Sequence, residues 1–421
     1  MNNIKELREK LDKKEISATD LVKKYLEKIK ENPSSYFVTV TEEMALESAK
    51  FAQKIINEGR SGLLTGIPAA IKDNICTDGI KTSCGSKMLE NFIPPYDAAV
   101  IEKLKSENYI MLGKSAMSEF AAGKSPENEG GAYAVSEGLC AFALSYGSSV
   151  DIGSAAEFYG LTGLAPSFGR VSRFGVAAFS SSFGRTGPIT NSAHDCGSIL
   201  SVISGYDSRD VVTKKSEDKN VFNDKVGMGV KGLKIFLPKE IFDDETDETI
   251  KSSVICIAKE FEKLGATLID GTLKSYSYAD AAYYLLSSAE ASSNLARYDG
   301  IKYGLRGEGK NYDDIVSDSR TKGFGEEVKR RIMFGNFALA GKNFEDYYLK
   351  ALAVKQQIKK EVDNIFEKAD IIISPVLKNI LNLTGHPVIT LPCGRKTGVS
   401  LMGKMFGESV LIGAADAFER R

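Results

Sequence analysis

From Gly66 onward, short apolar runs alternate with amphipathic segments, and this alternation limits the folds that the chain can adopt. Apolar runs at 67–71 and 109–113 lie on either side of an amphipathic segment at 98–106. Such an alternation is typical of β-α-β units, in which the connecting helices cover the sheet. The pattern therefore predicts an α/β domain whose sheet is largely parallel and covered by helices.

The first sixty residues have a different pattern, which predicts helices. Apolar side chains at Leu21, Val22, Tyr25, Leu26 and Ile29 repeat with the helical period, after polar N-cap candidates at 17–20. A second helix is expected from Glu42 to Glu58, ending at Gly59. We therefore expect an N-terminal helical segment at 1–60, packed on a single large α/β domain at 61–421.

The rest of the chain continues the mixed pattern. Residues 120–190 are rich in Gly, Ser and Ala, but they also contain large apolar side chains, which favours a closely packed core segment over a flexible tether. The polar stretch 205–230 predicts a surface loop. Further helices are expected at 246–264, 279–297 and 325–368, and further strands at 233–237, 371–373 and 388–391.

Composition excludes several classes of protein. The chain has 421 residues, with 55 basic and 56 acidic side chains, so its net charge of -1 gives no basic footprint for DNA. The N-terminus has no apolar signal core, and no apolar run is long enough to span a membrane. None of the six cysteines forms a CxxC pair, and the two histidines have no metal-ligand spacing. We expect a soluble, cytosolic protein without a cofactor or metal.

Five stretches of the chain carry a specific resemblance. Residues 66–74 (GIPAAIKDN), 160–173 (GLTGLAPSFGRVSR) and 187–190 (GPIT) resemble the amidase-signature family. Residues 289–300 (AEASSNLARYDG) and 324–333 (FGEEVKRRIM) resemble, within that family, the A subunits of glutamyl-tRNA(Gln)/aspartyl-tRNA(Asn) amidotransferases. The resemblance runs nearly end to end, as far as Phe418.

The resemblance implies a mixed central sheet with helices on both faces, and amide hydrolysis by a serine–serine–lysine set. A neutral lysine acts through a bridging serine to deprotonate a nucleophilic serine, and backbone N–H groups stabilise the oxyanion. It also implies a role in protein biosynthesis. The A subunit hydrolyses glutamine, and the ammonia reaches a partner that amidates mischarged tRNA. B- and C-type subunits, tRNA through them, and a small amide or amino-acid ligand are the implied partners.

Lys72 lies where the family has its catalytic lysine, at the end of a predicted strand. The bridging serine should follow in a GGSSGG motif. Here residues 125–128 (SPEN) match the segment upstream of that motif, and residues 129–135 (EGGAYAV) match the segment after it. The stretch between them, with its serine, is expected to be deleted.

The nucleophile should lie in a motif ALGSDTGGSIR, followed shortly by FCG. The chain has ALSYGSSVDIG at 143–153 and FYG at 158–160, with equal spacing, which puts Asp151 at the nucleophile position. An ionised aspartate there would pair with Lys72 and keep that lysine protonated. An alternative alignment, which needs compensating gaps, makes Ser154 the nucleophile. Ser149 is a further alternative hydroxyl.

The C-terminal part is shortened as well, after residues 373–376 and after residues 391–394, and both losses would trim the substrate pocket. These features give a leading hypothesis of a catalytically inactive pseudo-amidase that keeps the scaffold or a ligand site. Two alternatives stay open. One is an active amidohydrolase that uses Ser154 or Ser149 with Lys72, and the other is a non-enzymatic subunit that binds amidotransferase partners.

Overall fold

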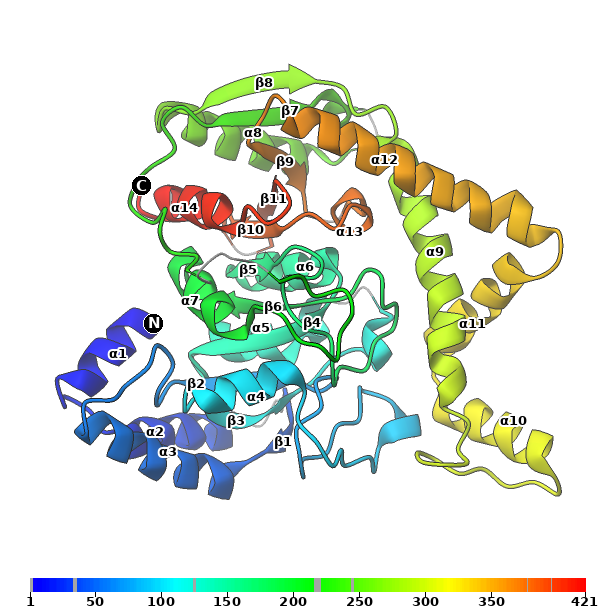
Figure 1. Ribbon diagram of the computed structural model, residues 1–421, viewed down its shortest axis with the longest axis horizontal. Coiled ribbons are helices and arrows are strands. Elements are labelled where there is room, and N and C mark those ends of the chain that lie inside the picture. Colours follow the sequence, from blue (N-terminus) through cyan, green and yellow to red (C-terminus); the bar gives the residue numbers. More distant parts are fainter. Residues whose placement is uncertain are drawn as a thin grey trace.

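A single mixed sheet organises the chain, as a computed structural model shows (Figure 1). Its eleven strands, counted over the described residues, follow the order β1-β3-β2-β4-β6-β5-β10-β11-β9-β7-β8, and helices flank them. The structure describes residues 3–32, 36–123, 126–215, 221–243, 246–376, 378–394 and 396–421.

The strands are short, and most of those in the middle of the sheet are buried along their whole length. Their bounds are β1 Phe37–Val40, β2 Pro68–Lys72, β3 Ile110–Ser115, β4 Phe142–Gly147, β5 Thr162–Ala165, β6 Arg185–Thr190, β7 Lys234–Pro238, β8 Thr267–Gly271, β9 Ile371–Pro375, β10 Val388–Pro392 and β11 Gly398–Gly403. Strands that are covered on both faces carry continuous apolar runs, which is why the sequence showed runs rather than alternation.

Several helices begin at a short polar residue whose side chain caps the first turn. At the start of α2, for example, the Ser17 side chain accepts a hydrogen bond from the Asp20 N–H. The α-helices are α1 Ile4–Asp12, α2 Ala18–Glu31, α3 Glu42–Asn57, α4 Ala99–Ser106, α5 Gly130–Ser136, α6 Ser149–Tyr159, α7 Ala193–Ile203, α8 Glu248–Lys263, α9 Ala279–Asn294, α10 Tyr312–Gly323, α11 Glu326–Leu339, α12 Lys350–Phe366, α13 Ile380–Leu383 and α14 Glu408–Glu419.

The prediction of a largely parallel sheet is wrong. Strands β2, β3 and β4 are parallel to one another, as are β7, β8 and β9, but the strands between these groups are antiparallel. Leu164 of β5, for example, lies opposite Ile389 of β10 in an antiparallel pair. The sheet is therefore mixed, as the resemblance implied. Strands from both halves of the chain lie side by side in its middle, and these neighbours run antiparallel.

The N-terminal segment contains a strand that the sequence analysis missed. Strand β1 has only four residues and pairs antiparallel with β3 at the edge of the sheet. The helices of this segment contribute Leu7, Val22 and Ala49 to the same hydrophobic core as the sheet. The Ile4 N–H also donates to Oδ2 of Asp195 on α7, at 2.9 Å. The division of the chain at residue 60 stays a prediction.

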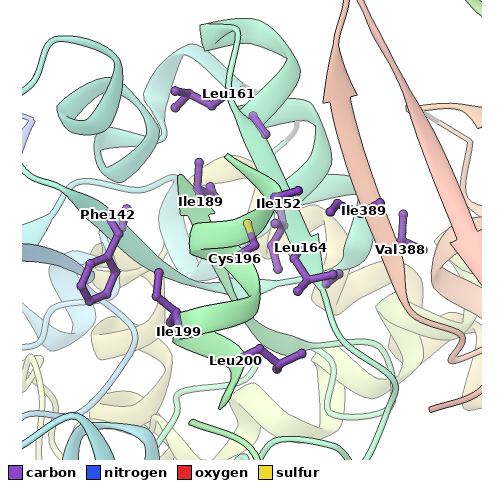
Figure 2. Close-up of a cluster of buried hydrophobic side chains, with 14 of the residues drawn as sticks. Phe142, Ile152, Leu161, Leu164, Ile189, Cys196, Ile199, Leu200, Val388 and Ile389 are labelled. Carbon is purple, nitrogen blue, oxygen red and sulfur yellow. The ribbon is translucent and has the colours of Figure 1, made fainter. Parts of the chain in front are cut away.

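The Gly-, Ser- and Ala-rich region forms the centre of the molecule. Figure 2 shows Phe142, Ile152, Leu164 and Ile189 around Cys196, and all five side chains are buried. They come from β4, α6, β5, β6 and α7, so this region is a packed core, as predicted. Small residues let these elements approach closely; a Cβ added at Gly163 of β5, for example, would meet the Ala156 side chain of α6 at 2.8 Å.

Helices α9 to α12 form an arm along one side of the molecule (Figure 1). A π-helix, Phe344–Leu349, leads into α12. Several large apolar side chains of this arm face solvent, among them Met333, Phe337 and Tyr347. Across the described part of the chain, no helix combines the length and apolarity needed to cross a membrane.

Candidate active site

Lys72 is the last residue of β2, and its side chain is only 2% exposed. Its Nζ lies 2.7 Å from Oε2 of Glu129, which is the residue immediately before α5. The expected partner was Asp151, but the ion pair that the structure forms with Lys72 is to Glu129. Glu129 reaches the lysine because the chain goes from the short 3₁₀ turn Pro126–Asn128 directly into α5.

No serine lies between the lysine and its partner. Nζ of Lys72 has no well-aligned hydrogen bond within the described residues, and its close polar contact is the Glu129 carboxylate. Burial raises the pKa of the Glu129 carboxyl, while the adjacent Lys72 ammonium opposes that rise. The group beside Lys72 is therefore a carboxyl and not a hydroxyl that could be activated.

Asp151 is the third residue of α6 and takes part in a capping box. The Ser148 N–H donates to Oδ2 of Asp151 at 2.8 Å, and the Asp151 N–H donates to Oγ of Ser148 at 3.2 Å. A carboxylate at this position also interacts favourably with the positive end of the helix dipole. The structure therefore gives Asp151 a structural task, and the spacing Ser148-x-x-Asp151 could have revealed it from the sequence.

The backbone donors at the start of α6 are used within the protein. The Val150 N–H donates to Oδ1 of Asn382 at 3.1 Å, and the Asn382 amide in turn donates to Oδ1 of Asn379 at 2.8 Å. Asn382 belongs to α13, the helix that follows β9. N–H groups at a helix N-terminus would be available to stabilise an oxyanion only if no side chain occupied them.

The two alternative nucleophiles lie on the same helix. The hydroxyl of Ser154 donates to the backbone oxygen of Asp151 at 3.3 Å, one turn further along α6. Ser149 is buried, and its hydroxyl has no hydrogen-bond partner within the described residues. Neither hydroxyl is hydrogen-bonded to Lys72 or Glu129, so the roles proposed for both serines stay predictions.

Little space remains beside Asp151. The cavity there has a volume of about 20 Å³ and is lined by Tyr146, Ser148, Asp151 and Tyr283, among others. A volume of this order holds about one water molecule. Arg331 of α11 lies near this group, where its guanidinium stacks on the Tyr284 ring at 4.0 Å. The sequence analysis singled out neither Tyr283 nor Arg331, although Arg331 lies in the motif at 324–333.

Comparison with known proteins identifies the family. The amidase family model matches residues 20–131 and 128–380, which is most of the chain. The chain belongs to the amidase family. It is 41% identical over 469 positions to the A subunit of the glutamyl-tRNA(Gln) amidotransferase of Caldanaerobacter subterraneus subsp. tengcongensis, and the match covers 99% of this chain and 96% of that protein. It is 39% identical over 469 positions to the second such A subunit of Clostridium acetobutylicum, with 99% and 98% covered.

Solved structures agree with this assignment to the amidase family. The crystal structure of the A subunit of glutamyl-tRNA(Gln) amidotransferase from Thermotoga maritima superposes with a TM-score of 0.77 at 29% identity, over 96% of this chain and 92% of that one. The peptide amidase of Stenotrophomonas maltophilia gives a TM-score of 0.84 at 23% identity, over 100% of this chain and 96% of that one, and shows the shared fold.

The alignments also bear on the missing segment. An alignment of 469 positions is longer than this chain of 421 residues, so the chain lacks residues that these amidase relatives have. The two parts of the amidase family match meet at residues 128–131, which is where Glu129 enters the site. Among the described residues, no group of three or more His, Cys, Asp or Glu side chains could hold a metal ion.

Proposed function

We propose that this chain is an amidotransferase subunit of the A type that has lost amide hydrolysis and retains a scaffolding role. The observation that carries the proposal is the buried pair of Lys72 and Glu129, 2.7 Å apart, with no serine hydroxyl hydrogen-bonded to Nζ. A lysine held by a carboxylate cannot take the proton of a serine nucleophile. Because the pair is buried, solvent cannot easily separate it.

Two further features support the loss of hydrolysis. Asp151, which the motif spacing places at the nucleophile position, has its carboxylate engaged in the capping box, and a carboxylate there does not form an acyl-enzyme by the family's chemistry. The Val150 N–H is occupied by Asn382, and loss of one oxyanion donor typically lowers kcat by about 10²–10³. Three separate parts of the reaction are therefore impaired, whereas the motifs of the scaffold remain.

An active amidohydrolase is the alternative, and the buried, unpartnered hydroxyl of Ser149 is the observation that favours it. Attack by Ser149 or Ser154 would still need a base, and Lys72 is engaged by Glu129. A covalent adduct on either serine after incubation with glutamine, located by mass spectrometry of peptides, would establish this alternative in place of the proposal.

The surface of the arm supports the scaffolding role. Met333 and Phe337 of α11, with Phe344 and Tyr347 of the π-helix, leave a large part of their side chains exposed. The Phe337 and Tyr347 rings lie 5.6 Å apart, so these side chains gather on one part of the surface. Clustered exposed apolar side chains are typical of interfaces between proteins. B- and C-type amidotransferase subunits in the cytoplasm are the proposed partners, and mischarged tRNA would be reached through them.

Reconstitution tests both halves of the proposal. The chain is mixed with the B and C subunits of the Caldanaerobacter amidotransferase, and amidation of glutamyl-tRNA is measured with ammonium chloride or with glutamine as nitrogen donor. We expect a complex that uses ammonium but not glutamine, whereas that enzyme's own A subunit should support both. Amidation with glutamine would disprove the loss of hydrolysis, and failure to co-purify would disprove the partnership.

Matched methionine variants locate the interface. Met333→Glu places a charge on the arm, where the methionine is 72% exposed, and should abolish co-purification with the B and C subunits. Met228→Glu places the same charge at a methionine that is 67% exposed outside the arm, and should leave co-purification intact. Equal behaviour of the two variants would contradict an interface on the arm.

A further inference from the structure

Two adjoining cavities lie near the candidate active site, and the smaller of them shares Tyr146 with the cavity beside Asp151. The larger has a volume of about 290 Å³ and the smaller about 200 Å³. Both are lined by Val176 and Arg297, so they meet at these two residues. We call them the ring cavity and the arginine cavity. Together they offer far more space than the cavity of about 20 Å³ beside Asp151.

Aromatic side chains make up much of the wall of the ring cavity. Phe92, Tyr96, Tyr298 and Tyr303 all line it. The Tyr303 ring lies 5.8 Å from the Phe92 ring and 6.1 Å from the Tyr298 ring, between ring centroids. Aromatic side chains at these spacings can pack against the ring of a ligand, either face to face with an offset or edge to face.

The floor of the ring cavity is apolar and uncharged. Cys76 and Cys84 contribute their thiols to it, and burial raises the pKa of both thiols, so they are not thiolates. Behind them, Nζ of Lys114 donates to Oγ1 of Thr82 at 2.9 Å and lies 4.0 Å from Asp73, so that charge is already compensated. An apolar ring is therefore the chemistry that this cavity accepts.

The arginine cavity contains one positive charge that has no acidic partner. Arg173 is bonded to Asp210 at 2.7 and 3.0 Å, and Arg209 forms ion pairs with Glu102 and Asp207. Arg297 differs from these two arginines. Its Nε donates to the Asn294 backbone oxygen at 2.9 Å, and within the described residues no carboxylate lies within ion-pair distance of it.

Tyr146 provides a second unsatisfied group in the arginine cavity. Its side chain is 2% exposed, and its hydroxyl has no hydrogen-bond partner within the described residues. Buried hydroxyls are normally hydrogen-bonded, so an oxygen of a ligand would complete this one. A single guanidinium without a counter-ion matches a monoanionic carboxylate better than a dianionic phosphate, whose second charge would stay uncompensated.

We propose that the ring cavity and the arginine cavity together bind a small aromatic carboxylate. The ring lies among Phe92, Tyr298 and Tyr303, and a short linker passes the junction at Val176. The carboxylate then accepts hydrogen bonds from Arg297 and from the Tyr146 hydroxyl. This site uses neither Lys72 nor Asp151, although Tyr146 also lines the cavity beside Asp151.

Calorimetric titration of the full-length protein with 3-phenylpropionate tests the proposal. Propionate lacks the ring and 3-phenyl-1-propanol lacks the charge, and each should bind at least about tenfold more weakly. The variant Arg297→Gln should weaken 3-phenylpropionate binding about tenfold or more. The variant Arg306→Gln, at an arginine that lines neither cavity, should leave binding unchanged.

A second variant tests the ring cavity separately. Ala177 lines the ring cavity, and Ala177→Leu should fill the space and abolish binding without changing any charge. The melting temperature of Ala177→Leu shows whether that variant folds. If it does not fold, the comparison of Arg297→Gln with Arg306→Gln still tests the proposal. Absence of 3-phenylpropionate binding, equal binding of propionate or of the alcohol, or binding unaffected by Arg297→Gln would each overturn the proposal.

Discussion

Replacing Glu408 by alanine is expected to lower the free energy of unfolding by about 3–5 kcal/mol, because it leaves a buried arginine without its counter-ion. Glu408 is fully buried, and its Oε2 lies 3.0 Å from Nη2 of Arg170. Its Oε1 also accepts from the Ser167 N–H at 2.9 Å. This pair joins the motif at 160–173 to the start of α14, so it connects two distant parts of the chain.

Urea denaturation of the wild type and the variant measures this difference. The control is Glu9→Ala, which removes an exposed ion pair to Lys13 at 3.9 Å and should cost less than about 1 kcal/mol. A similar, small cost for both variants would contradict the buried arrangement of Arg170 and Glu408.

Replacing Glu129 by alanine is expected to have an effect of the same size, about 3–5 kcal/mol, because Lys72 would remain buried without a carboxylate. The side chains of Lys72 and Glu129 are 2% and 11% exposed, so little water reaches the pair. Urea denaturation of the wild type and the variant at about pH 7 measures this difference.

The double variant Lys72→Met with Glu129→Leu separates the charge from the packing. It removes both charges and keeps apolar bulk, so it should recover most or all of the stability lost by Glu129→Ala. A double variant no more stable than the single one would mean that the loss arises from packing around Glu129, and the account of the ion pair would be wrong.

Much of the fold could be predicted from the sequence because periodicity is a local property. The helix expected at 42–58 is α3, and the apolar run at 67–71 is β2, shifted by one residue. Strand direction is not local, however. Leu164 and Ile389 face each other across an antiparallel pair although they are far apart in the chain, and nothing in either run indicates that pairing.

The candidate site was predicted less completely. The position of Lys72 followed from its motif, but its partner did not, because the contact to Glu129 depends on how the chain passes from the turn at Pro126–Asn128 into α5. Asp151 was paired with Lys72 from the spacing of the nucleophile motif and from its charge, whereas a hydrogen bond from the Ser148 N–H holds it at the start of its own helix. The contact of Asn382 to α6 could not be foreseen, since it joins residues 232 apart in the sequence.

Ammonia release from glutamine by the purified chain tests the loss of amide hydrolysis most directly. The assay compares the wild type with Lys72→Ala and with a relative, the Thermotoga maritima A subunit together with its partners, as the positive control. We predict that the wild type releases no more ammonia than Lys72→Ala. Ammonia release by the wild type that disappears in Lys72→Ala would contradict the account, because it would show that Lys72 still serves as a base.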